Sequence, residues 1–491
     1  MKAKLFILVL SGLLSCRPLF SQNITNTLGT SGVFTLKDNS VTYLSLSQST
    51  GNLSLNRSFV LPNTTSTTTG VLYKGTDRFL HNYGTDNTFL GIFSGNFTMT
   101  GSSNTVMGVS AFSFNASGSL NTAVGRSSLN SNNSGQSNSA LGSYSLYFNQ
   151  SGWNNTAVGS NSLYSNNASS NTAVGSNSLY TNSTGTENTA TGMEALFFNL
   201  AGNYNTALGF RSLRWNNSSL NTAVGWNSMF SNINGYENTA LGSNSLFNNN
   251  SSGNTAIGYI SLYTNTTGFQ NTAVGHHSLQ LNNGSYNTAL GYNAGSIVTT
   301  GLNLTLIGID ANPTSGTAND QVTLGNGFVN SLRCNVQTIT SLSDARDKKN
   351  IKELSLGLDF ITKLHPRQFN WDKREWYDNN VSDGSKMKEL PTAGFIAQEL
   401  DEAQTTAGVE WLNLVLKDNP EKWEATYGNL LPVVVKAIQD LKAENDELKN
   451  KNEVLEERLA KYEQMQNTLV KKMEELESKN SDTKEIKLGE K

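Results

Sequence analysis

Asn121-Thr122-Ala123-Val124-Gly125 is the stretch that decides the fold, because it returns along the middle of the chain at a fixed interval. Identical copies begin at Asn155, Asn171, Asn221 and Asn271, and near-copies fill the intervals between them. Each glycine of the motif lies 16 or 17 residues from the next. Such regularity indicates an internal repeat in which every copy is one structural unit. The glycines occupy positions 91, 108, 125, 142, 159, 175, 192, 209, 225, 242, 258, 275, 291, 308 and 325.

The length of the repeat selects the architecture. A helical-pair or propeller-blade repeat needs over about 30 residues, whereas this period suits one turn of a parallel β-solenoid, or β-roll. We predict two short strands per coil, one at the motif and one near Ser-Leu-Tyr, as in Ser162-Leu163-Tyr164. Corners are expected at a second asparagine, such as Asn166, because Asn and Gly tolerate positive φ. The predicted fold class is therefore mainly β.

Stacking of such coils has two consequences. Equivalent asparagines would form amide ladders, and equivalent Ala, Val and Leu would form a narrow core. A solenoid with so thin a core is marginal by itself. Ala157 and Val158 place apolar side chains on opposite faces of one strand. One face is therefore expected to pack inside the coil and the other against a second chain, which predicts an oligomeric fibre.

Charge and composition exclude several functions. Charged residues make up 15% of the chain, the net charge is -3, and no lysine occurs between Lys74 and Lys348, so a basic nucleic-acid-binding surface is not expected. His276-His277 has no acidic or thiol neighbour at ligand spacing, so we expect no metal site, and no cofactor is expected. A glycosidase needs a positioned pair of carboxylates, but the acids of the repeat are scattered, at Glu187, Glu194, Glu237, Asp310 and Asp320.

The first residues predict export. Residues 1–21 combine Lys2 and Lys4 with the apolar run Leu5–Leu14, which is typical of a cleavable signal peptide and too short to span a bilayer. The alternative is a lipoprotein site at Cys16. Either way the protein is expected to be secreted or held at the cell surface, without a transmembrane segment. Once Cys16 has left with a cleaved signal, Cys334 is the only thiol.

The rest of the chain divides by composition. We expect a β-region over 22–86, the solenoid over 87–330, a neck over 331–342, a small α/β domain over 343–430, a coiled coil over 431–480 and a disordered tail over 481–491. The coiled coil rests on a heptad that runs through six repeats with Glu and Lys on its flanks. Its apolar core positions, which we expect to hold the chains together, are Ile438, Leu441, Leu448, Leu455, Leu459, Tyr462, Leu469, Met473 and Leu476.

A hydroxyl and an amine lie five residues apart at the border between the two compositions, in Leu342-Ser343-Asp344-Ala345-Arg346-Asp347-Lys348-Lys349. A serine becomes a nucleophile when a base removes its proton, and a lysine serves as that base only when burial or nearby positive charge lowers its pKa. Arg346 and Lys349 could supply that charge. The junction is therefore a candidate for chain cleavage. The competing interpretation is that Ser343-Asp344 only caps a helix.

Two resemblances to known families sharpen these expectations. The repeat resembles the head repeats of YadA-type trimeric adhesins, which form β-rolls in trimers. The C-terminal third resembles the endosialidase-type intramolecular chaperone that ends phage tailspikes and fibres. That second resemblance rests on Ser343-Asp344-X-Arg346-X-Lys348, Gly394-Phe395-Ile396-Ala397-Gln398-Glu399, Tyr427, Leu431-Pro432-Val433-Val434-Val435-Lys436-Ala437-Ile438 and the coiled coil.

The second resemblance implies a homotrimer whose C-terminal domain templates folding of the fibre and then releases itself. It assigns the catalytic pair to Ser343 and Lys348, in a single-turnover reaction of the serine endopeptidase type. The cleaved bond adjoins Ser343, on the side of either Leu342 or Asp344, and both sides stay open. The partner outside the trimer is expected to be a glycan or another cell-surface ligand. The alternatives are a fibre that is not cleaved and a tailspike that binds or hydrolyses glycans.

Overall fold

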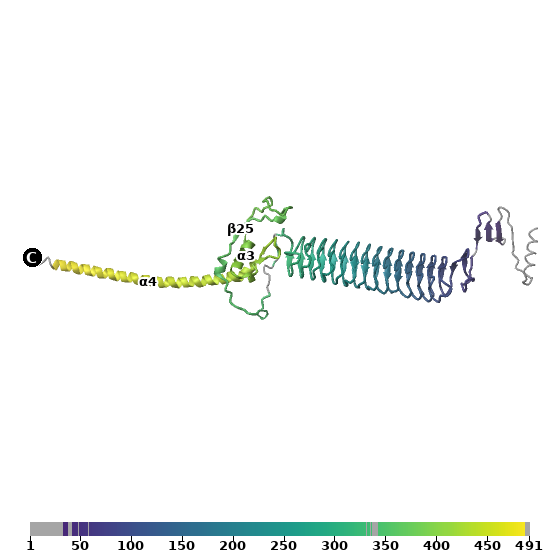
Figure 1. The fold of residues 1–491 in the computed structure, drawn as a ribbon, viewed down its shortest axis with the longest axis horizontal. Coiled ribbons are helices and arrows are strands. Elements are labelled where there is room, and N and C mark those ends of the chain that lie inside the picture. The colour runs from purple at the N-terminus through teal and green to yellow at the C-terminus, as the bar shows by residue number, and fades with distance from the viewer. Residues whose placement is uncertain are drawn as a thin grey trace, which may run out of the picture. The chain divides into compact units, whose positions relative to one another are not determined.

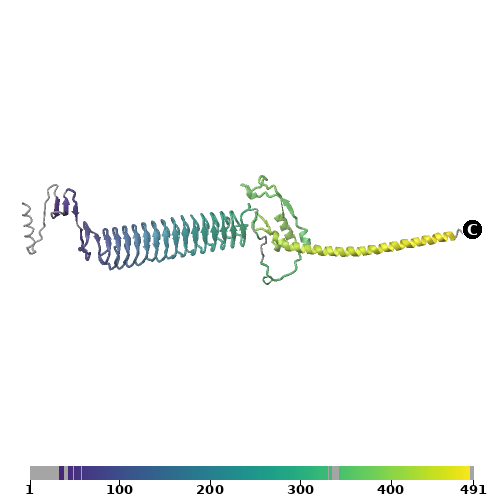
Figure 2. The same cartoon turned by 180° about the vertical axis from the view of Figure 1, so that it is seen from behind.

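The computed structural model of the protein describes residues 33–37, 42–47, 49–56, 58–329, 331–333, 335 and 342–486. The predicted export signal, Cys16 and Cys334 lie outside these residues, as does much of the predicted neck. The chain forms two compact units, and the boundary between them follows Ser170. Figures 1 and 2 show the chain from opposite sides, and within each unit the coils are drawn as a stack of rungs.

The first unit begins with short antiparallel strands. β1 (Val33–Lys37), β2 (Thr42–Ser47) and β3 (Leu53–Leu55) form a three-stranded sheet. β4 (Leu72–Lys74) and β5 (Asp77–His81) form a hairpin, and β5 pairs antiparallel with the first solenoid strand, β6 (Thr88–Leu90). Because an open strand edge invites association, this hairpin caps the N-terminal end of the solenoid.

Parallel strands of three residues build the coils of the first unit. They pair in strict register, with each Thr, Ala or Val beside its equivalent, as in Ala123 beside Ala140 and Ala140 beside Ala157. This register follows from the constant spacing of the motif. The strands are β6, β7 (Thr105–Met107), β8 (Thr122–Val124), β9 (Ser139–Leu141) and β10 (Thr156–Val158).

The second unit repeats this arrangement from β12 (Thr172–Val174) to β24 (Val322–Leu324). The predicted parallel β-solenoid of 16–17-residue coils is confirmed. The intervening strands of the motif are β14 (Thr189–Thr191), β15 (Thr206–Leu208), β17 (Thr222–Val224), β19 (Thr239–Leu241), β20 (Thr255–Ile257), β21 (Thr272–Val274), β22 (Thr288–Leu290) and β23 (Thr305–Ile307).

The second strand predicted near Ser-Leu-Tyr begins directly after these three residues, which themselves form a turn. Leu163 and Leu179 there have φ of 50° and 46°, in the left-handed region, and both are fully buried. A left-handed leucine costs about 1–2 kcal/mol, but burying its side chain contributes about 1.5–3 kcal/mol. The backbone thus turns so that each leucine enters the core, and its N–H donates to the next coil, as from Leu146 to Ser162 O at 3.0 Å.

The second strands each begin two residues after the buried leucine or methionine of their coil and are only two residues long. They are β11 (Ser165–Asn166), β13 (Thr181–Asn182), β16 (Trp215–Asn216) and β18 (Ser231–Asn232). The asparagine expected at a corner, such as Asn166, is instead buried within such a strand. Its side chain faces the interior, where the amide bonds to neighbouring coils.

The predicted amide ladders are present inside the coils. Asn121 Nδ2 donates to Asn104 Oδ1 at 3.1 Å and to Gly135 O at 3.0 Å. A second ladder uses the other asparagine of each coil, as in Asn149 Nδ2 to Asn132 Oδ1 at 2.9 Å. A buried amide without partners would be costly. The ladders therefore turn buried polar groups into bonds between coils.

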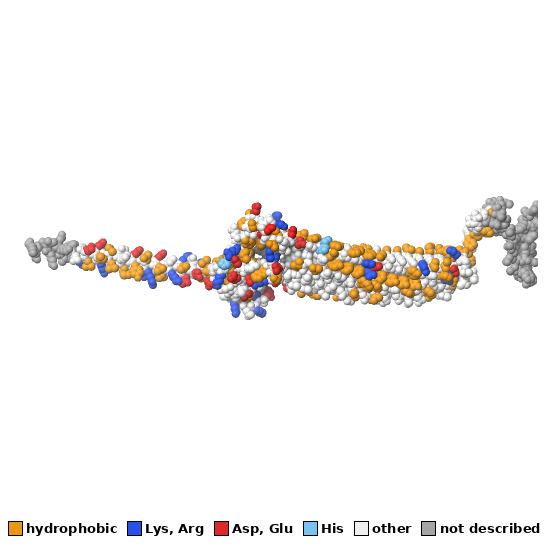
Figure 3. Space-filling model, turned by 45° about the horizontal axis from the view of Figure 1, so that its top comes forward, with side chains coloured by type: hydrophobic (Ala, Val, Ile, Leu, Met, Phe, Trp, Pro, Cys, Tyr) orange, Lys and Arg blue, Asp and Glu red, His pale blue; other side chains and the backbone are white. Residues whose placement is uncertain are grey.

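The outer surface of the coils carries regular columns of side chains. Where the residue that follows the buried alanine is a leucine, it points outward and is about half exposed, as at Leu141, Leu208 and Leu290. A second column stacks aromatic rings, with Tyr147 and Tyr164 5.3 Å apart and Phe230 and Phe247 5.0 Å apart. Figure 3 shows apolar side chains gathered in bands over the coils.

The C-terminal domain of the second unit is a small α/β structure. β25 (Arg367–Phe369) pairs antiparallel with β26 (Thr392–Gly394), which leads into α3 (Ala397–Thr406). The remaining short elements are η1 (Ala345–Asp347), α2 (Leu358–Ile361), η2 (Arg374–Trp376), η3 (Glu410–Leu412), β27 (Val415–Leu416), β28 (Glu424–Ala425) and η4 (Tyr427–Leu430).

A compact hydrophobic core holds this domain together. It joins α2 and α3 to the start of the long helix, and it buries Phe360, Leu364, Leu400, Val409, Leu412, Leu414, Val415, Leu430 and Val433. At about 1.5–3 kcal/mol for each large apolar side chain, this cluster is the main source of the domain's stability. It also fixes the direction in which the long helix leaves.

The long helix is α4 (Leu431–Ile486). It extends through residues 481–486, so that part of the predicted disordered tail is helical, because Glu and Lys propagate a helix at little cost. Residues 487–491 lie outside the described part. All nine apolar heptad residues are more than half exposed. Among the described residues, no helix is both long and apolar enough to cross a membrane.

Candidate self-processing junction

Ser343 and Lys348 are in contact. Lys348 Nζ donates a hydrogen bond to Ser343 Oγ. The short helix η1 between them produces this contact, because its last bond, from Lys348 N to Ala345 O at 3.2 Å, reverses the chain. The five-residue spacing in the sequence thereby becomes a direct pairing of hydroxyl and amine.

Asp344 and Arg346 hold η1 in place. Asp344 is its N-cap, and Asp344 Oδ1 accepts from Arg346 N at 2.8 Å. The two side chains also form an ion pair of 2.6 Å. The hydrogen bonds from Arg346 lower the pKa of Asp344, and the same contact raises the pKa of Arg346. The capping interpretation is thus correct for Asp344, while Ser343 is left to contact Lys348.

The other predicted residues of the junction have different surroundings. Arg346 forms its ion pair with Asp344 and not with a group at Lys348, so its expected effect on Lys348 stays a prediction. Lys349 is exposed, and Leu342 is fully exposed. Every residue from 342 to 350 is exposed in the single chain. The peptide bonds on either side of Ser343 are therefore accessible, but the burial that would activate a lysine base is not supplied by this chain alone.

Residues of the Gly394–Glu399 motif meet Tyr427. The Tyr427 hydroxyl accepts from Phe395 N at 3.1 Å and donates to Phe395 O at 3.3 Å. A side chain at position 394 would place its Cβ 2.9 Å from that hydroxyl, which explains the glycine there. Glu399 pairs with Arg367 at 2.8 Å, and this hydrogen bond lowers the pKa of Glu399. The motif therefore ties β26 and α3 to the start of η4.

The long helix is anchored to α2 by Asp440. Its carboxylate accepts from Leu358 N at 3.3 Å and from Lys436 Nζ, and the hydrogen bond from Lys436 lowers the pKa of Asp440. A Cβ at position 357 would lie 1.9 Å from Asp440 Oδ2, so a larger residue there would displace this carboxylate. This contact links the predicted coiled coil to the domain that follows the junction.

A large groove, which the sequence did not indicate, lies beside this motif. Its volume is about 940 Å³. Trp371 is in its wall together with Trp423, and Lys373 lies 5.2 Å from the Trp371 ring. The further aromatic lining residues are Phe369, Phe395 and Tyr427.

Glu194, one of the scattered acids of the solenoid, lies between two arginines. Glu194 Oε2 accepts from Arg211 Nε and from Arg214 Nε, each at 2.8 Å. Burial would raise the pKa of Glu194, but the hydrogen bonds and charges of Arg214 and Arg211 outweigh it, so the pKa is lowered. A general acid needs a raised pKa. Among the described residues, no group of three or more His, Cys, Asp or Glu could hold a metal ion.

Comparison with known proteins identifies one part of the chain. Residues 343–409 match the family model described as chaperone of endosialidase, and this match begins at Ser343. No curated protein and no solved structure matches the chain. The resemblance of the repeat to YadA-type heads stays a prediction. The C-terminal domain is therefore an endosialidase-type chaperone domain, and it follows a parallel β-solenoid as in a tail-fibre-like protein.

Proposed function

We propose that this protein is an exported homotrimeric fibre that attaches to a surface, and that its C-terminal domain folds the fibre and then cuts itself free at Ser343. The observation that carries the proposal is the hydrogen bond between Lys348 Nζ and Ser343 Oγ at the first residues of the chaperone domain. A serine paired with a lysine is an established nucleophile and base.

The reaction balances with these two groups and water. Neutral Lys348 takes the Ser343 hydroxyl proton while Oγ attacks a peptide carbonyl, and the peptide nitrogen leaves as an amine with that proton. Water then hydrolyses the resulting ester and restores the hydroxyl. Attack on the Leu342 carbonyl is an N-to-O shift within one chain, whereas cutting the bond to Asp344 needs the serine of a neighbouring chain. Assembly would bury the junction, which favours the neutral lysine.

Trimerisation is supported by the apolar side chains that the single chain leaves uncovered. Leu448, Leu455 and Leu469 are each 58–59% exposed on one face of α4, and packing at a heptad seam would bury them. The half-exposed aliphatic column on the solenoid offers a second surface for the same contact. A glycan or other surface ligand is the expected target of the finished fibre.

Denaturing electrophoresis of the purified full chain tests the cleavage. The wild type is expected to give fragments 1–342 and 343–491, or their neighbours displaced by one residue, and Ser343→Ala and Lys348→Ala are expected to stay intact. Lys352→Ala, at another exposed lysine, is the matched control and should still be cut. The mass of the small fragment identifies the bond. A wild-type chain that stays intact after assembly would contradict the proposed self-cleavage.

A further inference from the structure

The last solenoid coil ends in an open strand edge. β23 pairs with β24 on one side, and no other described strand is registered against β24. Two of its three side chains are at least half exposed, Val322 at 70% and Leu324 at 50%. An open edge with apolar side chains is a template for association. The solenoid therefore needs a cover at its C-terminal end while it folds.

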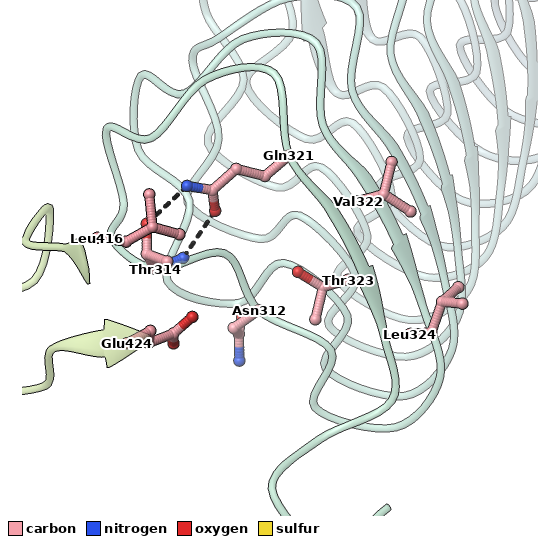
Figure 4. Close-up of a pocket in the computed structure, with 8 residues that line it drawn as sticks. All are labelled: Asn312, Thr314, Gln321, Val322, Thr323, Leu324, Leu416 and Glu424. Carbon is pink, nitrogen blue, oxygen red and sulfur yellow. Dashed lines mark hydrogen bonds between the residues drawn. The ribbon is translucent and has the colours of Figure 1, made fainter. Parts of the chain in front are cut away.

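The hairpin of β27 and β28 lies at this edge. Leu416 pairs with Glu424 across the hairpin, and both residues face the last coil across a cavity of about 350 Å³. Figure 4 shows the hairpin beside the end of the coils, with β24 on the opposite side of this cavity. The hairpin therefore lies beside the edge, and Val322 and Leu324 of β24 stay exposed.

A side-chain clamp closes the last coil next to this cavity. Gln321 Nε2 donates to Thr314 Oγ1 at 2.7 Å, and Gln321 Oε1 accepts from Thr314 N at 3.0 Å. Gln321 occupies the place where Asn287 and earlier coils have the ladder asparagine. The longer side chain reaches back along the chain and joins the last residue of the loop between β23 and β24 to Thr314 in the middle of that loop. These bonds form only when that loop has closed.

Asp418, in the turn between β27 and β28, contacts this clamp. Its Oδ2 accepts from Thr314 Oγ1 at 3.3 Å and from Gln321 Nε2 at 3.4 Å. Gln321 Nε2 thus uses one hydrogen for Thr314 and the other for Asp418. Asp418 can accept from both Thr314 Oγ1 and Gln321 Nε2 only when these two residues of the last coil lie next to each other.

We propose that Asp418 and its hairpin are the surface through which the chaperone domain recognises the completed last coil of this same chain. The inference rests on the proposed folding role of that domain and adds the contact that performs it. Two side-chain hydrogen bonds across an open cavity hold the edge weakly. A paired strand would keep the domain attached after cleavage, whereas this contact lets it leave.

Refolding of the full chain tests this contact. The Ser343→Ala background keeps the domains connected, and the recovery of assembled protein after dilution from denaturant is followed by size-exclusion chromatography. Asp418→Ala is expected to slow recovery about three- to tenfold, the effect of losing hydrogen bonds to an exposed charged group. Asp418→Asn, which keeps the shape, should slow it less. Asp383→Ala, at another carboxylate of the domain that accepts from Ser385 N, is the control.

A double-mutant cycle separates the contact from general damage. If Gln321 and Asp418 act together, Gln321→Ala combined with Asp418→Ala should be no slower than the slower single variant. Equal refolding rates for Asp418→Ala and the control Asp383→Ala would overturn the inference. A double variant whose slowing equals the product of the slowing by Gln321→Ala and by Asp418→Ala would overturn it as well. A chain ending at residue 342 that assembles as fast as the full chain would instead refute the folding role itself.

Discussion

Asn205 donates both its backbone N–H and its Nδ2 to the same Oδ1 of Asn188, each at 3.0 Å. Both side chains are at most 1% exposed. Asn205 Nδ2 also donates to Ser218 O at 2.8 Å, and Asn205 Oδ1 accepts from Asn221 N at 3.0 Å. One amide thus satisfies groups from three neighbouring coils. The ladder is a cooperative part of the fold, because each amide completes the bonding of the next.

Replacing Asn205 by alanine should therefore destabilise the solenoid strongly. The change removes three side-chain bonds and leaves the buried N–H of Asn221 without its acceptor, which we expect to cost about 2–4 kcal/mol. The urea midpoint of the full chain measures the effect. Asn234→Ala, at an exposed asparagine of the same array, should change the midpoint little, and equal shifts for the two variants would contradict a ladder role.

Gly209 is required for the spacing of the coils. Its φ is 135°, and a Cβ there would lie 2.4 Å from Gly225 O, so Gly209→Ala should prevent stacking at this coil. Gly253 also has positive φ, at 71°, but Glu237 and Gln270 occupy the equivalent place in other coils with φ of 57° and 55°. Gly253→Asn should therefore fold normally. Soluble yield and circular dichroism compare the two, and a folded Gly209→Ala would show that the coils can separate.

Acid should loosen the N-terminal cap at His81. This ring is buried, its Nε2 bonds to Ser94 O at 2.9 Å and its Nδ1 accepts from Tyr83 N at 3.4 Å, as a neutral tautomer requires. Burial lowers the pKa of His81, the Ser94 bond opposes this, and the Arg78 charge lowers it further. A lowered folded pKa means that the stabilisation is present above about pH 6.5 and is lost as the pH falls through the folded value.

Hydrogen exchange over residues 72–95 at pH 7 and at pH 5 measures this effect. Relative to the exchange of an unstructured chain at the same pH, the wild type should be less protected at pH 5 than at pH 7. His81→Gln, which cannot gain a proton, should lose most of that difference. His277→Gln, at a half-buried histidine bonded to Gln280, should behave like the wild type. A pH effect of unchanged size in His81→Gln would assign it to another group.

The heptad predicts which face of α4 joins the chains. Leu455 and Val454 are adjacent and similarly exposed, at 59% and 52%, but only Leu455 lies at a core position. Leu455→Lys should disrupt the trimer, because three lysines would meet in an apolar seam. Val454→Lys should leave the trimer intact. Light scattering of the two variants gives the mass, and loss of the trimer in both would contradict the predicted register.

Features that recur at short range could be predicted from the sequence. The constant spacing of the motif requires equivalent residues to lie side by side, and it therefore predicted the parallel coils and the amide ladders. The heptad of α4 could be predicted for the same reason. The contact between Ser343 and Lys348 spans only five residues, so one short turn is enough to form it. The catalytic role of that pair stays a prediction.

The tertiary structure decided what depends on competition between energies or on distant residues. Leu163 adopts a left-handed backbone where a strand was expected, because burial of its side chain outweighs the local cost. Arg346 is near Lys348 in sequence but binds Asp344. Asp418 meets Thr314 across 104 positions of the chain. Periodicity determined the repeat because every coil meets the same neighbour, whereas these contacts occur once and exist only after the parts have packed.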